Sequence, residues 1–228
     1  MIKNYNDFIT KLLEFGFSGA VFGKNDGVFG LFRYGWGVED GLKWHTDDPE
    51  TDPWLWRIRV LEERNDIAYS KLFFKKAGFI TKEWYPYFLS ARREGKVFEE
   101  DYYNGNISHV GKRIYEAISE NKQLALHEIK SIIRMQKDEK SKFDTALTEL
   151  QMKMYITICG QKQAMSFSGI EYGWPSTMYT TTENFFGEDI FDEASFYTSD
   201  EAISIITKQI YKLNQAPQEN KILKFIKG

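Results

Sequence analysis

A short helical pattern in the second half of the chain carries polar side chains that could contact DNA. Its apolar side repeats with the i, i+3, i+4, i+7 spacing of one buried helix face, at Phe143, Ala146, Leu147 and Leu150. The opposite side presents Lys142, Thr145, Thr148, Glu149 and Met152. An ammonium group binds phosphate, and hydroxyl groups bind both phosphate oxygens and base edges. Lys142, Thr145 and Thr148 are therefore the predicted DNA contacts of this helix.

Two helical patterns precede this one, and two strand patterns follow it. The earlier helices are predicted from apolar side chains three and four residues apart, at Ile107, Val110, Ile114 and Ile118 and then at Leu126, Ile129 and Ile133. Ser141 is the predicted N-cap of the third helix. β-Branched residues predict strands at 155–159 and 174–182. Three short helices followed by two strands are the order of a winged helix-turn-helix, which we predict for residues 107–182.

The loop between the two predicted strands would form the tip of the wing. It spans residues 161–173 and contains Lys162, Gln163, Ser166 and Ser168. Ammonium, amide and hydroxyl groups are suited to contacting a phosphate backbone or a minor groove. Lys162 and Gln163 are therefore the predicted DNA contacts of the wing.

Aromatic rings and cations are mixed in the segment between Trp54 and Lys96. It has ten Lys or Arg against five acids, and its cations include Arg57, Lys71, Lys75 and Lys76. Such cations could follow a phosphate backbone while the rings stack on exposed bases. In the alternative interpretation the rings form core, and the cations face solvent or pair with the loop at 39–52, which has six acids and one lysine.

The charge of the predicted winged helix leaves a protein-binding interpretation open. The third helix has Asp144 and Glu149 beside Lys142, and residues 107–163 hold ten basic against seven acidic residues. Cationic contacts supply most non-specific affinity for DNA, and this excess is mild. As a protein-interaction module, the chain would bind a partner through the acidic stretch at 183–201 and a terminal helix at 202–213.

Composition limits the class of protein. One cysteine, Cys159, excludes an internal disulfide, and three scattered histidines predict no metal site. We find no phosphate-cradling glycine motif and no catalytic triad, and we expect no cofactor. Without a signal peptide or a run of about 18 apolar residues, we expect a cytoplasmic protein that contacts no membrane. The net charge of −3 gives no global attraction to DNA, so binding would need local basic patches.

These patterns predict an α+β fold that is mainly helical. The N-terminal domain, at 1–103, is expected to be mixed and helical, with a first helix at 4–15 and another beginning after Pro53. The winged helix-turn-helix, at 104–185, would pack on it. The remaining residues, 186–228, would hold the acidic segment and a C-terminal helix.

Four segments together resemble a family of bacterial proteins called AlkZ-related. They are Trp44–Arg57, Lys75–Pro86, Phe143–Met152 and Tyr172–Trp174. The resemblance covers roughly residues 40–185. That family looks like a shortened relative of the AlkZ-like DNA glycosylases, which are built from tandem winged helices and excise alkylated or crosslinked bases. The resemblance therefore implies double-stranded DNA as the partner, with base excision as the alternative function.

One departure puts catalysis in doubt. The glycosylases place a Gln-apolar-Gln or Gln-apolar-Asp triplet in the N-terminal half, and this chain has none there. Gln161 and Gln163 flank a lysine instead, and they lie in the predicted wing. If hydrolysis is retained, Asp48 and Asp52 are the best substitutes, because a carboxylate can orient water and stabilise a cationic sugar. Each of these two aspartates directly precedes a proline, so ordinary turn formation is the other explanation for their presence.

Overall fold

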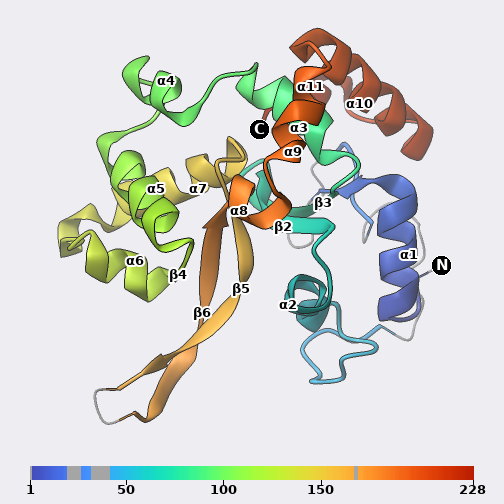
Figure 1. Ribbon diagram of the computed structural model, residues 1–228. Helices are drawn as coiled ribbons and strands as arrows, with labels where there is room; N and C mark the ends of the chain where they lie inside the picture. The colour runs from blue at the N-terminus through green and yellow to red at the C-terminus, as the bar shows by residue number, and fades with distance from the viewer. Residues whose placement is uncertain (1, 20–26, 32–41, 167–168) are drawn as a thin grey trace.

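The computed structural model describes residues 2–19, 27–31, 42–166 and 169–228 (Figure 1). Helices surround one antiparallel sheet with the strand order β1-β3-β2-β5-β6-β4. The strands are β1 (Phe17–Ser18), β2 (Ile67–Phe73), β3 (Lys76–Thr81), β4 (Gln123–Ala125), β5 (Ile156–Met165) and β6 (Glu171–Thr181). The helices are α1 (Tyr5–Phe15), α2 (Pro53–Glu63), α3 (Tyr85–Arg93), α4 (Phe98–Tyr103), α5 (His109–Asn121), α6 (Leu126–Ile132), α7 (Lys140–Met152), α8 (Thr182–Phe186), α9 (Asp189–Ser195), α10 (Ser199–Leu213) and α11 (Glu219–Lys227).

The first two helices begin where the sequence predicts. The side chain of Asn4 accepts a hydrogen bond from the backbone N–H of Asp7 and caps α1. Gly16 ends the helix with a φ of 86°, in the left-handed region that glycine adopts without strain. Pro53 is the first residue of α2, where its missing N–H costs no helical hydrogen bond.

The central aromatic and basic segment contains a β-hairpin between α2 and α3, within the part of the chain where we had expected a mixed helical domain. Strands β2 and β3 pair antiparallel, and the turn between them places Phe74 and Lys75 at φ values of 50° and 61°. Glycine and asparagine are the usual residues for such a turn, and neither is present. The rings of Tyr69, Phe73 and Phe79 are buried in the core, as the alternative interpretation of this segment holds.

The second half of the chain forms its elements in the predicted order. Helices α5, α6 and α7 precede the β5–β6 hairpin, and the short strand β4 pairs with β6. Two details differ from the prediction. Helix α7 begins at Lys140, and the described residues give it no side-chain hydrogen bond at its N-terminus, so Ser141 lies inside the helix. The hairpin strands extend to Met165 and from Glu171, so Lys162 and Gln163 are strand residues instead of loop residues.

Several contacts join the first and second halves of the chain, and two of them involve β2 and the end of α3. Tyr69 of β2 pairs with Ile158 of β5, so a single sheet crosses the boundary predicted near residue 103. The guanidinium of Arg92, at the end of α3, donates hydrogen bonds to the backbone oxygens of Met152, Phe225 and Ile226. It thereby binds the C-terminal ends of both α7 and α11, whose last carbonyls lack partners within their own helices.

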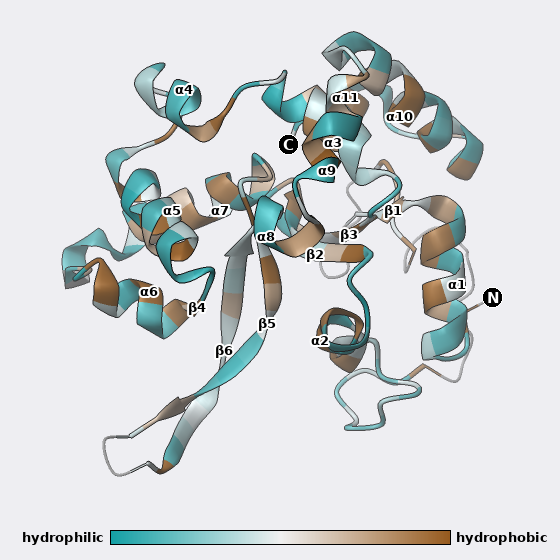
Figure 2. Ribbon diagram, viewed as in Figure 1, coloured by the Kyte–Doolittle hydropathy of each residue, from teal (hydrophilic) through white to brown (hydrophobic). Residues whose placement is uncertain are grey.

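Helix α10 has polar residues on one side and apolar residues on the other. Figure 2 shows alternating hydrophobic and hydrophilic turns along α10, the pattern of an amphipathic helix. Ala202, Ile206 and Ile210 form its buried side. The β5–β6 hairpin extends away from the helices (Figures 1 and 2). In the described part of the chain, every helix is too short or too polar to cross a membrane.

Candidate nucleic-acid interface

A groove of about 550 Å³ lies between the N-terminal part of α7 and the β2–β3 hairpin. It is lined by Lys71, Lys75, Lys140, Ser141, Asp144, Thr145, Thr148 and Glu149. The lining therefore includes three lysines and two carboxylates. The fold brings together four predicted DNA contacts from segments about 70 residues apart in sequence: Lys71, Lys75, Thr145 and Thr148.

The position of Lys71 follows from the alternation of strand β2. Its neighbours Ser70 and Leu72 point into the core, so the lysine side chain points outward. Its backbone N–H donates to Oε1 of Gln151 at 3.1 Å, and its ammonium donates to Oγ1 of Thr148 at 3.3 Å. Strand and helix thus hold this lysine at the edge of the groove. Lys75 lies in the hairpin turn and is exposed.

Thr148 corrects the prediction for the outward face of α7. Its side chain is 8% exposed, and its hydroxyl donates to the backbone oxygen of Asp144 while accepting from Lys71. The periodicity of α7 alone could not reveal this, because the covering strand comes from the first half of the chain. Lys142 and Thr145 are exposed, as predicted. The open part of the face therefore includes Lys142, Thr145 and Glu149 but not Thr148.

The two predicted wing contacts are held by neighbouring elements. Lys162 forms an ion pair of 2.6 Å with Glu128 of α6 and keeps half of its side chain exposed. The amide nitrogen of Gln163 donates to the backbone oxygens of Tyr172 and Gly173 on the facing strand. Gln163 therefore stabilises the hairpin, and its amide donors are directed toward the protein.

The hairpin also exposes apolar side chains that the predicted contacts omit. Trp174 is 92% exposed and Tyr172 is 58% exposed, and Met165 and Ile170 near the tip are more than half exposed. Large apolar groups gathered on an extended hairpin mark an interaction site. Proteins that bind the minor groove insert such side chains between base steps. In the sequence these residues look like ordinary strand material, so their exposure was not foreseen.

Arg57 and Lys76 lie outside the lining of the groove. Arg57 belongs to α2, where its Nε donates to the backbone oxygen of Trp54 and its guanidinium stacks 3.7 Å from the centre of that ring. The ring of His45 lies 4.8 Å from the same indole. Burial raises the pKa of Tyr69, and the positive charge of Arg57 opposes that shift. These contacts hold Arg57 against the ring of Trp54.

Asp48 and Asp52 both organise the turn before α2. Asp52 is completely buried, and its two oxygens accept from the backbone N–H groups of Thr46 and Trp54, at 2.7 and 2.8 Å. Asp48 is exposed, and hydrogen bonds from the hydroxyl of Thr51 and the N–H of Glu50 lower its pKa. A catalytic role for either carboxylate stays a prediction, while the capping role of Asp52 accounts for its contacts.

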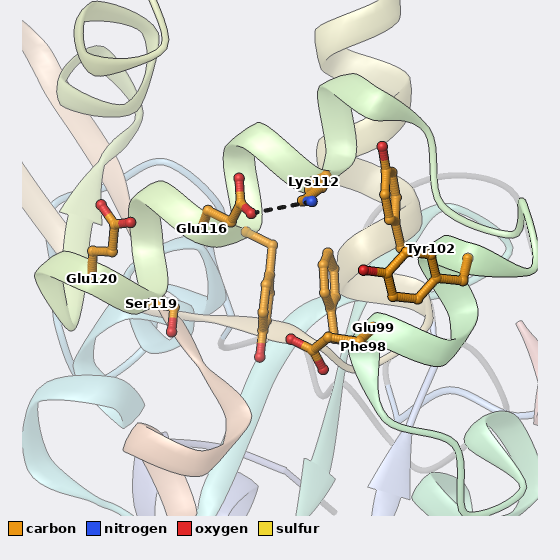
Figure 3. Close-up of a pocket in the computed structure, with 9 residues that line it drawn as sticks. Phe98, Glu99, Tyr102, Lys112, Glu116, Ser119 and Glu120 are labelled. Atoms are coloured by element: carbon orange, nitrogen blue, oxygen red, sulfur yellow. Dashed lines mark ion pairs between the residues drawn. The ribbon is translucent and has the colours of Figure 1, made fainter.

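A smaller cavity of about 250 Å³ lies between α4 and α5 (Figure 3). The ammonium of Lys112 lies 3.6 Å from Glu116 and 4.5 Å from the centre of the Tyr102 ring. Glu99 and Glu120 also line the cavity. Since three carboxylates face one lysine, the cavity is a poor site for phosphate.

The described part of the chain gives no support for a metal site or for a reactive thiol. Among these residues, no group of three or more His, Cys, Asp or Glu could hold a metal ion. Burial raises the pKa of Cys159 to about 11, which leaves its thiol largely protonated at neutral pH.

Comparison with known proteins identifies the family. A family model described as AlkZ related matches residues 2–227. No curated protein and no solved structure matches the chain. The family match covers nearly the whole chain, beyond the segments at 40–185 that carried the resemblance. The chain therefore belongs to the AlkZ-related family.

Proposed function

We propose that this protein binds double-stranded DNA, with residues 107–182 forming a winged helix-turn-helix. Helix α7 would be the recognition helix, and the β5–β6 hairpin would be the wing. The order of α5, β4, α6, α7, β5 and β6, with β4 paired to β6, supports this assignment. Membership of the AlkZ-related family associates the chain with DNA repair and agrees with a DNA partner.

The observation that carries the proposal is the groove with its three lysines beside α7. Lys71, Lys75 and Lys140 come from two elements and face the same space. Phosphate contacts made by lysine fix the register of a protein on a duplex, and exposed hydroxyls beside them can reach base edges. Lys142 and Thr145, exposed on the same helix, extend this surface.

The hairpin would make the second contact. A wing that exposes Trp174 and Tyr172 can place rings against the sugar edges or between base steps of a minor groove. Binding would then combine cationic contacts along the phosphates with apolar contacts at the wing. Catalysis is not part of this proposal, since the Gln-apolar-Gln triplet is missing from the N-terminal half and Asp52 serves as a helix cap.

Fluorescence anisotropy with a labelled duplex at several salt concentrations tests the proposal. If about six phosphates are contacted, affinity should fall by roughly 10³ between about 50 and 200 mM salt. A duplex with alkylated bases, measured in parallel, shows whether the protein prefers damaged DNA. Lack of binding at low salt, or affinity that does not change with salt, would refute DNA binding by this surface.

A further inference from the structure

A cavity of about 850 Å³ lies beside the end of α3, between the α3–α4 connection, α5, α8 and α9. Its described lining residues are different from those of the groove beside α7. Cavities of this size are typical of sites for small molecules. The proposed DNA contacts do not use it.

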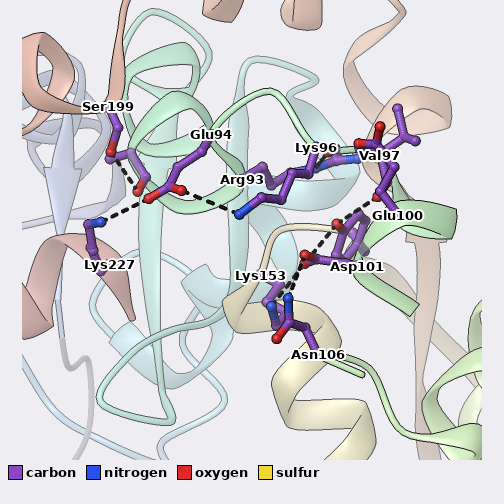
Figure 4. A network of polar contacts seen from close by, with 12 residues as sticks. Arg93, Glu94, Lys96, Val97, Glu100, Asp101, Asn106, Lys153, Ser199 and Lys227 are labelled. Atoms are coloured by element: carbon purple, nitrogen blue, oxygen red, sulfur yellow. Dashed lines mark hydrogen bonds and ion pairs between the residues drawn. The ribbon is translucent and has the colours of Figure 1, made fainter. Parts of the chain in front are cut away.

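Arg93 lies at the inner wall of this cavity, in the last turn of α3. It is 6% exposed, and its Nε donates to the backbone oxygen of Lys96 at 3.3 Å (Figure 4). Its guanidinium stacks 4.1 Å from the ring centre of Tyr155 and 5.0 Å from that of Phe191. Its Nη1 is buried and has no hydrogen-bond partner among the described residues.

Glu183, in the first turn of α8, faces this guanidinium. Its Oε1 lies 4.0 Å from Nη1 of Arg93, beyond hydrogen-bond distance, and its Oε2 is buried without a partner among the described residues. Buried polar atoms are nearly always hydrogen-bonded, because an unpaired one loses the hydrogen bonds that it would make with water. Two residues that line the cavity therefore each hold a polar atom, one donor and one acceptor, without a hydrogen-bond partner among the described residues.

The charges and rings around the cavity restrict what that ligand can be. Acidic residues outnumber basic ones, since Glu94, Glu99, Glu188 and Asp192 line it together with Lys96. Figure 4 shows that Glu94 binds both Lys96 and Lys227, which leaves Lys96 partly neutralised. The remaining walls include the rings of Phe98, Tyr115, Phe191 and Tyr197. Such a site favours a flat, neutral or cationic molecule and repels phosphate.

We infer that this cavity binds a nucleobase or nucleoside that carries no phosphate. The edge of a base offers an acceptor next to a donor, which matches Nη1 of Arg93 and Oε2 of Glu183. The flat face of the base can stack on the aromatic walls, as it does in proteins that read unpaired bases. Neither match depends on whether the chain also binds duplex DNA.

Isothermal titration calorimetry with adenosine, guanosine and their 5′-monophosphates tests this inference on the full chain. We expect at least one nucleoside to bind, and its monophosphate to bind about tenfold more weakly or not at all. Glu183→Gln should weaken nucleoside binding about tenfold, because it replaces one of the two acceptor oxygens by an amide donor and removes the negative charge beside Arg93. Glu193→Gln, an exposed change on α9 outside the cavity lining, is the matched control and should bind as the wild type does.

A second variant keeps the test decisive if Glu183→Gln does not fold. Glu188→Lys, at an exposed position of the cavity lining, should narrow the difference between nucleoside and monophosphate. Failure of both nucleosides to bind the wild type would overturn the inference. So would a monophosphate that binds as tightly as its nucleoside, or unchanged nucleoside affinity in folded Glu183→Gln.

Discussion

The Ser70 hydroxyl donates a hydrogen bond of 2.8 Å to Oε1 of Gln151, and both side chains are completely buried. Ser70 belongs to β2 and Gln151 to the last turn of α7, 81 residues later. The same Oε1 accepts from the backbone N–H of Lys71. This contact fixes the proposed recognition helix against the strand that carries a groove lysine.

Removal of this link should destabilise the protein. We expect Gln151→Ala to lower the free energy of unfolding by about 1–3 kcal/mol, because the Ser70 hydroxyl loses its buried acceptor. Urea unfolding of Gln151→Ala, Ser70→Ala and the double variant measures the coupling. The double variant should lose clearly less than the sum of the two single changes. Strict additivity would mean that the two side chains do not stabilise each other.

Asp52 should behave as a buried helix cap. Asp52→Ala removes the acceptors of two backbone N–H groups and should lower the free energy of unfolding by about 0.5–2 kcal/mol. Asp52→Asn keeps one acceptor and should lose less. Asp48→Ala, at the surface of the same turn, should cost less than Asp52→Ala. Thermal unfolding of the three variants gives the ranking, and equal losses for Asp52→Ala and Asp48→Ala would contradict it.

Stability below about pH 4 should depend on Asp101. Burial raises the pKa of this carboxyl, but hydrogen bonds from Lys153, Asn106 and Tyr155 outweigh that effect and hold it below the ordinary 3.8. Its stabilising contribution is therefore complete above that value and disappears as the pH falls through the lower folded-state pKa.

The variant that tests this pH dependence is Asp101→Asn. It should be less stable than the wild type by about 1–3 kcal/mol at pH 7, and the difference should shrink as the solution is acidified below about pH 4. Urea midpoints at several pH values measure both curves. A difference that stays constant down to pH 3 would show that the charge of Asp101 is not what stabilises the fold.

Trp174 should contribute to DNA binding without contributing to folding. Because its side chain is 92% exposed, Trp174→Ala should change the free energy of unfolding by less than about 0.5 kcal/mol. Loss of a ring that stacks on DNA should weaken binding about tenfold. Phe196→Ala removes another exposed ring, on the connection after α9, and should leave DNA affinity unchanged. Equal affinities of the two variants would argue against contact through the wing.

Local sequence patterns predicted much of the second half of the chain. Apolar spacing located α5, α6 and α7, and β-branched residues located β5 and β6 to within a few residues at most ends. Within each of these elements the spacing of apolar residues marks the buried face, so that spacing is sufficient to find the element. Pro53 and Asn4 likewise mark the starts of α2 and α1, because both act on the backbone locally.

The features that the sequence patterns did not predict depend on contacts between segments that are far apart in the sequence. The turn at Phe74 and Lys75 contains no glycine or asparagine, so the β2–β3 hairpin gave no turn pattern. Thr148 and Gln151 are buried because β2 covers them, which the pattern of α7 cannot show. As a result, Lys71, Lys75, Thr145 and Thr148 were predicted individually as DNA contacts and Lys140 was not, and the arrangement of these residues around one space came only from the fold.

The most direct measurement is the salt dependence of duplex binding by a variant of the groove. Lys75→Ala/Lys140→Ala removes two exposed lysines of the groove, and Lys208→Ala/Lys212→Ala removes two from the exposed side of α10. The groove variant should bind more weakly, and the slope of log K against log salt should decrease in magnitude by roughly 1.8 for two lost phosphate contacts. The α10 variant should keep the wild-type slope. Identical slopes for both variants would contradict the claim that DNA lies along this groove.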